Sequence, residues 1–150
     1  MSNLKVKIKR LNPKAILPAY QTEHAAGMDL HACIDEPMII QPLQRLMVST
    51  GFSLELPVGY EAQIRARSGL SIKNGITMIN GIGTIDCDYR GEVCALVVNI
   101  SDQPFTVEPG MRIAQMIIAK YEKVDWETAD SLSQTKRGDV GFGSTGVKSK

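Results

Sequence analysis

Two aspartates and a tyrosine in a glycine-rich stretch are the residues of this sequence best suited to chemistry on a small ligand. The stretch is NGIGTIDCDYRGEV, residues 80–93, and it carries Asp86, Asp88 and Tyr89. A carboxylate can act as a general base that takes a proton from water. On a strand that runs into a hairpin, Asp86 and Asp88 share one face, because side chains alternate along a strand. The alternative interpretation is a pair of solvated charges in the hairpin.

Four further stretches combine glycine with polar or charged residues that packing alone does not require. They are AAGMDLHA (25–32), RSGLSIKNG (67–75), RIAQMI (112–117) and RGDVGFGSTG (137–146). In the second stretch an arginine, a hydroxyl and a glycine precede a possible helix, whose free N–H groups could bind phosphate. The alternative is that Ser68 merely caps that helix.

The last of these stretches has the groups that a triphosphate-binding segment needs. Arg137 can grip a phosphate with two hydrogen bonds, and Ser144 and Thr145 offer hydroxyl donors. Phe142 could stack on a flat heterocycle, which is worth about 1–3 kcal/mol. The alternative is a flexible tail, since the composition after residue 134 is polar and rich in glycine.

Strand patterns dominate the elements that must position these residues. Residues 4–11 and 60–67 alternate apolar and polar side chains, which is typical of half-buried strands. Residues 92–100 and 112–121 are more continuously apolar, as in strands covered on both faces. One short helix is expected at 69–75. Short strands with frequent turns predict an all-β sandwich or barrel.

Two turns and one domain division complete the expected organisation. Pro109 and Gly110 predict a type II turn with Gly110 at positive φ, and residues 88–93 predict a tight hairpin turn around Arg90 and Gly91. We expect a single β domain over residues 1–136 and a flexible arm over residues 137–150.

Composition excludes several classes of protein. The 150 residues include 43% hydrophobic residues, enough for one core, and 17 Lys and Arg against 16 Asp and Glu give a net charge of +1. That balance argues against nucleic-acid binding, which requires many neutralised phosphates. No apolar run is long enough for a membrane span. Three cysteines without metal-ligand or paired spacing predict reduced thiols, and hence a cytoplasmic protein.

Taken together, in this order and at these spacings, the five stretches resemble the five motifs of the trimeric deoxyuridine triphosphate nucleotidohydrolases (dUTPases). The resemblance runs from about residue 25 to residue 146. It implies a jelly-roll-like β-sandwich, a homotrimer with shared active sites, and hydrolysis of dUTP to dUMP and pyrophosphate by water attack on the α-phosphate. It also implies a Mg²⁺ ion carried on the substrate phosphates and water, with no direct protein ligand.

The resemblance assigns a role to each matching residue. Asp86 would activate the water, Tyr89 would pack beneath the deoxyribose, and Asn80 with the backbone from Gly83 to Asp86 would read uracil. The full set of substrate contacts that it implies is Arg67, Ser68, Gly69, Asn80, Gly83, Thr84, Ile85, Asp86, Tyr89, Cys94, Gln115, Arg137, Phe142, Gly143, Ser144 and Thr145. Asp29 and Arg112 would be a supporting pair, and the arm resembles a lid that closes over the triphosphate.

One departure and two rival functions accompany the resemblance. Val140 stands where the family more often has a glycine, so it should stiffen the arm. A dCTP deaminase-like enzyme shares the general fold, but Asp86, Tyr89 and Phe142 fit the hydrolase better. A non-catalytic β-trimer that binds or regulates a partner would have no need of the set Asp86, Tyr89, Gln115 and Arg137.

Overall fold

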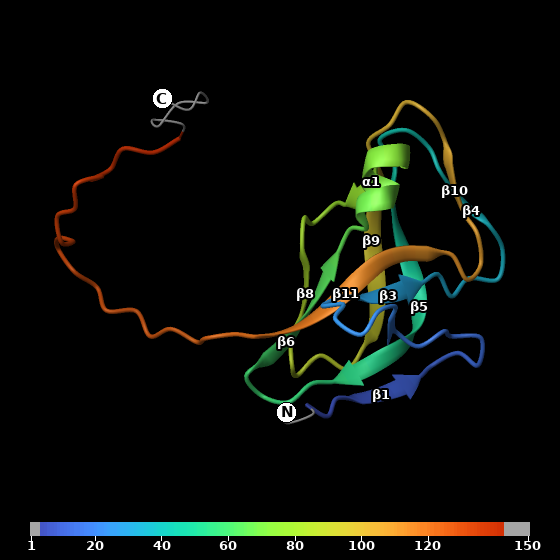
Figure 1. Cartoon of the computed structure of the whole chain (residues 1–150), viewed down its shortest axis with the longest axis horizontal. Helices are drawn as coiled ribbons and strands as arrows, with labels where there is room; N and C mark the ends of the chain where they lie inside the picture. The colour runs from blue at the N-terminus through green and yellow to red at the C-terminus, as the bar shows by residue number, and fades with distance from the viewer. Residues whose placement is uncertain (1–3, 143–150) are drawn as a thin grey trace.

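Antiparallel strands form the body of the protein in the computed structural model, which describes residues 4–142. One sheet has the order β1 (Lys7–Arg10), β5 (Arg45–Glu55), β9 (Glu92–Asn99) and β7 (Ile76–Met78). A second has the order β2 (Ala19–Tyr20), β3 (Met28–His31), β11 (Arg112–Lys120), β6 (Tyr60–Arg65) and β8 (Gly83–Ile85). β10 (Phe105–Val107) pairs with β4 (Met38–Ile40). The predicted all-β sandwich of jelly-roll type is confirmed (Figure 1).

The core lies where the sheets face one another. Phe52 and Val97 from the four-stranded sheet are buried in one cluster with Leu30 and Ile64 from the five-stranded sheet. The predicted alternation holds in β6, where Ala62 and Ile64 are buried and their neighbours are half-buried. Burial of these side chains contributes roughly 25 cal/mol per Å² of apolar surface. β1 differs from expectation: it is an edge strand, so even Ile8 stays 39% exposed.

The predicted helix is present as α1, Ser68–Asn74. Arg67 occupies the N-cap position and makes no side-chain cap bond, so Ser68 is the first helical residue and not the cap. Gly75 ends the helix in the left-handed region at φ 65°, and its N–H donates to the Ser71 carbonyl at 3.1 Å. Within residues 4–142, no helix is both long and apolar enough to cross a membrane.

The predicted turn at Pro109 and Gly110 agrees with the structure, since Gly110 has φ 77°. The predicted hairpin around Arg90 and Gly91 is wrong. β8 pairs with β6 and β9 pairs with β5 and β7, so the two strands belong to different sheets. The reversal is instead a turn over residues 86–89, in which the Tyr89 N–H donates to the Asp86 carbonyl at 3.1 Å. We call this segment the Asp86 turn.

The correction also applies to the two aspartates. β8 ends at Ile85, so Asp86 and Asp88 are turn residues and not alternate positions of a strand. Gly91 has a different use from the predicted one. A side chain at Gly91 would collide with the Tyr89 ring and hydroxyl, so glycine lets the ring lie against the backbone.

The chain leaves the β body after β11. Residues 121–142 contain no helix or strand and run away from the sheets as an extended segment (Figure 1). Trp126 is 90% exposed and Leu132 is 89% exposed, which leaves large apolar groups uncovered in a single chain. The division into a domain over 1–136 and an arm over 137–150 stays a prediction. Gly143, Ser144 and Thr145 lie outside the described residues.

Candidate active site

A pocket of about 250 Å³ contains most of the residues that the motifs assigned to uracil and sugar, but neither Asp86 nor Phe142. Asn80, Gly83, Thr84, Ile85, Tyr89 and Cys94 all line it, together with apolar side chains from β5, β6, β7 and β9. β8 is the edge strand of its sheet, so β6 occupies only one of its two edges. The other edge of β8 therefore has backbone N–H and C=O groups that a base can use.

Tyr89 and Cys94 have well-defined surroundings in this pocket. The Tyr89 hydroxyl donates to the Glu92 carbonyl at 3.1 Å, so the ring is held at the pocket wall. It is still 45% exposed, as a surface for a ligand must be. Cys94 lies on β9 opposite Ser49. Burial raises the pKa of the Cys94 thiol, so this cysteine is a neutral group at pH 7 and not a nucleophile.

Asp86 lies on the other side of its turn from Tyr89. It lines a second pocket of about 390 Å³, together with Glu61, Cys87, Asp88, Tyr121 and Lys123. The exposed Asp86 side chain is therefore accessible to water. The turn links the two pockets, because Ile85 and Tyr89 line one and Asp86 and Asp88 line the other.

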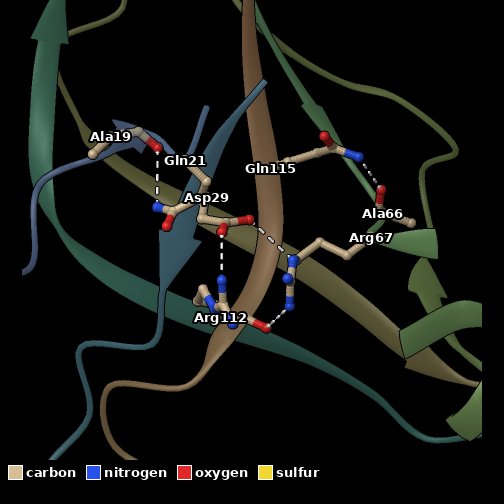
Figure 2. A network of polar contacts seen from close by, with 7 residues as sticks. All are labelled: Ala19, Gln21, Asp29, Ala66, Arg67, Arg112 and Gln115. Carbon is tan, nitrogen blue, oxygen red and sulfur yellow. Dashed lines mark hydrogen bonds and ion pairs between the residues drawn. The ribbon is translucent and has the colours of Figure 1, made fainter. Parts of the chain in front are cut away.

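A network centred on Asp29 holds the second group of candidate residues (Figure 2). Asp29 is 8% exposed and pairs with two arginines, through Arg67 Nε at 3.0 Å and Arg112 Nη1 at 3.1 Å. Arg67 also donates from Nη1 to the Arg112 carbonyl at 3.1 Å. The predicted contact of Asp29 with Arg112 is present. The Arg67 contact was missed, and no spacing in the sequence signals it.

Gln115 connects this network to the start of α1. Its Nε2 donates to the Ala66 carbonyl at 2.9 Å, just before Arg67 (Figure 2). Gly27 lies beside it, and a Cβ at Gly27 would lie 2.5 Å from Gln115 Oε1, so a larger residue there would shift the Gln115 carboxamide. Ser68 and Gly69 follow directly and are exposed. The network therefore fixes the backbone that presents these two residues to solvent.

His31 is a neighbour of this network that the sequence analysis passed over. It lies opposite Arg112 in the β3–β11 pair. Its Nδ1 is buried and has no hydrogen-bond partner among the described residues. Burial lowers the pKa of His31 below its ordinary value of 6.5; Asp29 opposes this, and Arg112 and Arg67 add to it. The lowered pKa favours the neutral imidazole.

A pH dependence of stability follows. Between pH 6.5 and the lowered folded value, the unfolded chain binds more protons than the folded chain, so acid favours unfolding. The Tm of the parent protein should therefore fall as the pH is lowered below 6.5. We expect His31→Gln to remove the part of this decrease that His31 causes. His24→Gln is the matched control, because His24 is exposed. Equal pH profiles for the parent and the His31→Gln protein would contradict this assignment.

The third group of candidate residues lies on the extended segment. Arg137 Nε donates to the Val140 carbonyl at 2.9 Å, and the Val140 N–H donates to the Arg137 carbonyl at 3.2 Å. Phe142 is fully exposed, at φ 49°. Neither Arg137 nor Phe142 lines the pocket or contacts the Asp29 network, and the segment that carries them runs away from the β body (Figure 1).

Comparison with known proteins decides the family. The dUTPase family model matches residues 13–146. The chain belongs to the dUTPase family. A deoxyuridine 5'-triphosphate nucleotidohydrolase of Rickettsia felis is 53% identical over 148 residues, which cover 98% of this chain and 100% of that protein. The same-named protein of Orientia tsutsugamushi is 51% identical over 148 residues, with 97% and 100% covered.

Solved dUTPase structures share the fold. A Staphylococcus bacteriophage 80alpha dUTPase with dUpNHpp superposes with a TM-score of 0.86 at 24% identity and covers 95% of this chain and 99% of that chain. A mutant dUTPase from phage phi11 of S. aureus, described with a structural Mg(II) ion, has a TM-score of 0.75 at 19% identity, with 85% and 97% covered. The jelly-roll arrangement of this chain is therefore the dUTPase fold.

Proposed function

We propose that this chain hydrolyses dUTP to dUMP and pyrophosphate. The observation that carries the proposal is that a member of the dUTPase family forms a pocket lined by Asn80, Gly83, Thr84, Ile85 and Tyr89, which its motifs assign to the nucleoside. Relatives about half identical over nearly the whole chain are named for this activity. The pocket, the Asp29 network and the extended segment supply the three kinds of contact that a nucleoside triphosphate needs.

The pocket suits a pyrimidine base. The open edge of β8 offers backbone N–H donors and C=O acceptors. The Asn80 carboxamide adds an NH₂ donor group and a carbonyl acceptor. A site that hydrogen-bonds its ligand rejects molecules lacking the right groups far better than an apolar pocket does. Gly83 is buried against Ile64 and Asn80, so a larger residue would narrow the pocket. Thymine would be excluded by lack of space for its methyl group.

The hydrolytic step uses Asp86 as the general base. The carboxylate takes a proton from water as the water oxygen bonds to the α-phosphorus. The bond from the α-phosphorus to the bridging oxygen breaks, and pyrophosphate leaves with that oxygen. A positioned base of this kind contributes roughly 10²–10⁴-fold to rate. Asp86 is exposed on its turn, next to the pocket that we assign to the nucleoside.

The phosphates would lie at the start of α1. Ser68 and Gly69 are exposed there, and the Asp29 network holds Arg67 and Gln115 beside them. Among residues 4–142, no three His, Cys, Asp or Glu side chains cluster in a way that could hold a metal ion. We propose a Mg²⁺ ion that is ligated by the phosphate oxygens of the substrate and by water. Such an ion would offset the negative charge of the triphosphate.

Tyr89 would make the enzyme specific for deoxyribose. Its hydroxyl is bonded to the Glu92 carbonyl and its ring lies against Gly91, so the ring would occupy the space that a 2′-hydroxyl needs. We expect Tyr89→Ala to narrow the preference for dUTP over UTP by at least about tenfold in kcat/KM. Steady-state kinetics on both nucleotides measure this. An unchanged preference would remove the sugar-checking role of Tyr89.

We propose that the protein is a homotrimer with shared active sites. Arg137 and Phe142 lie on a segment that leaves its own β body, so that segment could close over a neighbouring subunit (Figure 1). In such a trimer the exposed Trp126 and Leu132 would pack against a neighbouring subunit. Light scattering that gave the mass of a single chain, 16.4 kDa, would contradict the trimer.

The position of attack can be tested directly. When dUTP is hydrolysed in water enriched in ¹⁸O, attack at the α-phosphorus puts the label into dUMP and leaves pyrophosphate unlabelled. Mass spectrometry of the two products separates this from attack at the β-phosphorus, which labels pyrophosphate. The second result would overturn the mechanism while leaving dUTP as the substrate.

A further inference from the structure

Tyr121 joins the end of β11 to the Asp86 turn. It directly follows β11, and its backbone N–H donates to the Gly59 carbonyl at 3.1 Å. Its hydroxyl lies 3.5 Å from Sγ of Cys87, a residue 34 positions earlier in the chain. The backbone of Tyr121 is thus fixed on the sheet, and its side chain reaches across to the turn.

Cys87 is the point where that contact acts on the turn. It stands between Asp86, whose carbonyl accepts from the Tyr89 N–H, and Asp88. Its own carbonyl accepts from Arg90 Nη1 at 2.7 Å. Two residues from outside the turn therefore hold Cys87: Tyr121 contacts its side chain, and Arg90 binds its backbone carbonyl. Both contacts restrain the short segment that carries Asp86 and Tyr89.

The turn has few other restraints. It follows β8, an edge strand of three residues, and Asp86, Asp88 and Tyr89 are all exposed. Segments with few buried contacts open easily unless specific bonds hold them. The bond to Cys87 is also the main reason why the pKa of Tyr121 is raised above its ordinary value.

We infer that Tyr121 is a positioning residue that holds the Asp86 turn through Cys87, so that the Asp86 carboxylate stays aimed at its water. The inference rests on the proposed hydrolysis of dUTP. It gives a role to Cys87, a residue to which the motif comparison assigned none. It also ties the residue at which the extended segment begins to the residue that performs the chemistry.

Four variants test the inference by kinetics with dUTP. Tyr121→Phe removes only the hydroxyl, and we expect kcat to fall about three- to tenfold, with KM within about twofold. Cys87→Ala should give the same loss of kcat. The double variant should be no slower than either single variant, because each substitution removes the same Tyr121–Cys87 interaction. Cys87→Ser keeps an acceptor and should stay near the parent rate. Tyr20→Phe, on β2, is the matched control for loss of a tyrosine hydroxyl.

Hydrogen–deuterium exchange gives a second readout that needs no activity. Tyr121→Phe should speed exchange of the Tyr89 amide, which is bonded to the Asp86 carbonyl, whereas Tyr20→Phe should not. Parent-like kcat in Tyr121→Phe, or additive losses in the double variant, would overturn the inference. Faster exchange without a change in kcat would overturn it too. An inactive parent protein would overturn the proposed function, and exchange alone would then decide whether Tyr121 holds the turn.

Discussion

Replacing Asp86 with asparagine is expected to lower kcat for dUTP hydrolysis by about 10²–10⁴-fold while KM stays nearly constant. The amide keeps the size and hydrogen-bonding shape of the carboxylate but cannot take a proton from water at neutral pH. Because the side chain is exposed on a turn, the substitution should leave the fold intact. Pyrophosphate release under saturating dUTP measures the effect, and dUTP binding by calorimetry shows that the site remains.

Asp88→Asn is the matched control for that experiment. Asp88 lies in the same turn, is also exposed and lines the same pocket. A loss confined to Asp86→Asn assigns the base to that position. Equal losses of kcat in both proteins would mean that the negative charge around the turn supports the reaction and that Asp86 is not the general base. A parent-like rate in Asp86→Asn would remove the assignment.

Asp29→Asn is expected to lower the free energy of unfolding by about 2 kcal/mol, or Tm by about 4–8 °C. The carboxylate is almost buried and is shared by Arg67 and Arg112. Removing its charge leaves two guanidinium groups close together with no counter-ion between them. The expected decrease in the free energy of unfolding is smaller than for a fully buried ion pair, because the Arg112 side chain is 49% exposed and solvent screens its charge.

Asp35→Asn provides the comparison. Asp35 pairs with Lys14 at 2.7 Å, but both side chains are more than two-thirds exposed. Such pairs contribute little, so Tm should not change measurably. Thermal denaturation of the two variants at the same pH tests the difference. If Asp29→Asn were as stable as the parent, the network would not hold the start of α1.

The strands could be predicted because alternation is a local property. Ala62 and Ile64 face the core on β6 as their spacing indicates, and β11 follows its apolar run almost to the residue. Strand partners are not a local property. Residues 80–93 resemble a hairpin in composition, yet β8 joins β6 and β9 joins β5 and β7. In the sequence, Arg90 and Gly91 suggest a hairpin turn. In the structure, Gly91 instead makes room for the Tyr89 ring.

The candidate site shows the same limit. The motifs pointed to the residues that line the pocket, because a resemblance carries residue identities. They did not reveal that Asp29 holds Arg67 as well as Arg112, since that contact depends on β3 lying beside β11 with a bulge between Arg112 and Ala114. His31 and Tyr121 were missed for the same reason. Their importance comes from neighbours that are distant in sequence.

We propose that this protein is a dUTP-specific pyrophosphohydrolase. The most direct test is pyrophosphate release from dUTP, UTP, dTTP and dCTP, measured side by side with Mg²⁺, with ammonia release from dCTP followed in the same samples. We predict rapid release from dUTP and much slower release from the other three nucleotides. Ammonia from dCTP, or no pyrophosphate from dUTP, would contradict the claim.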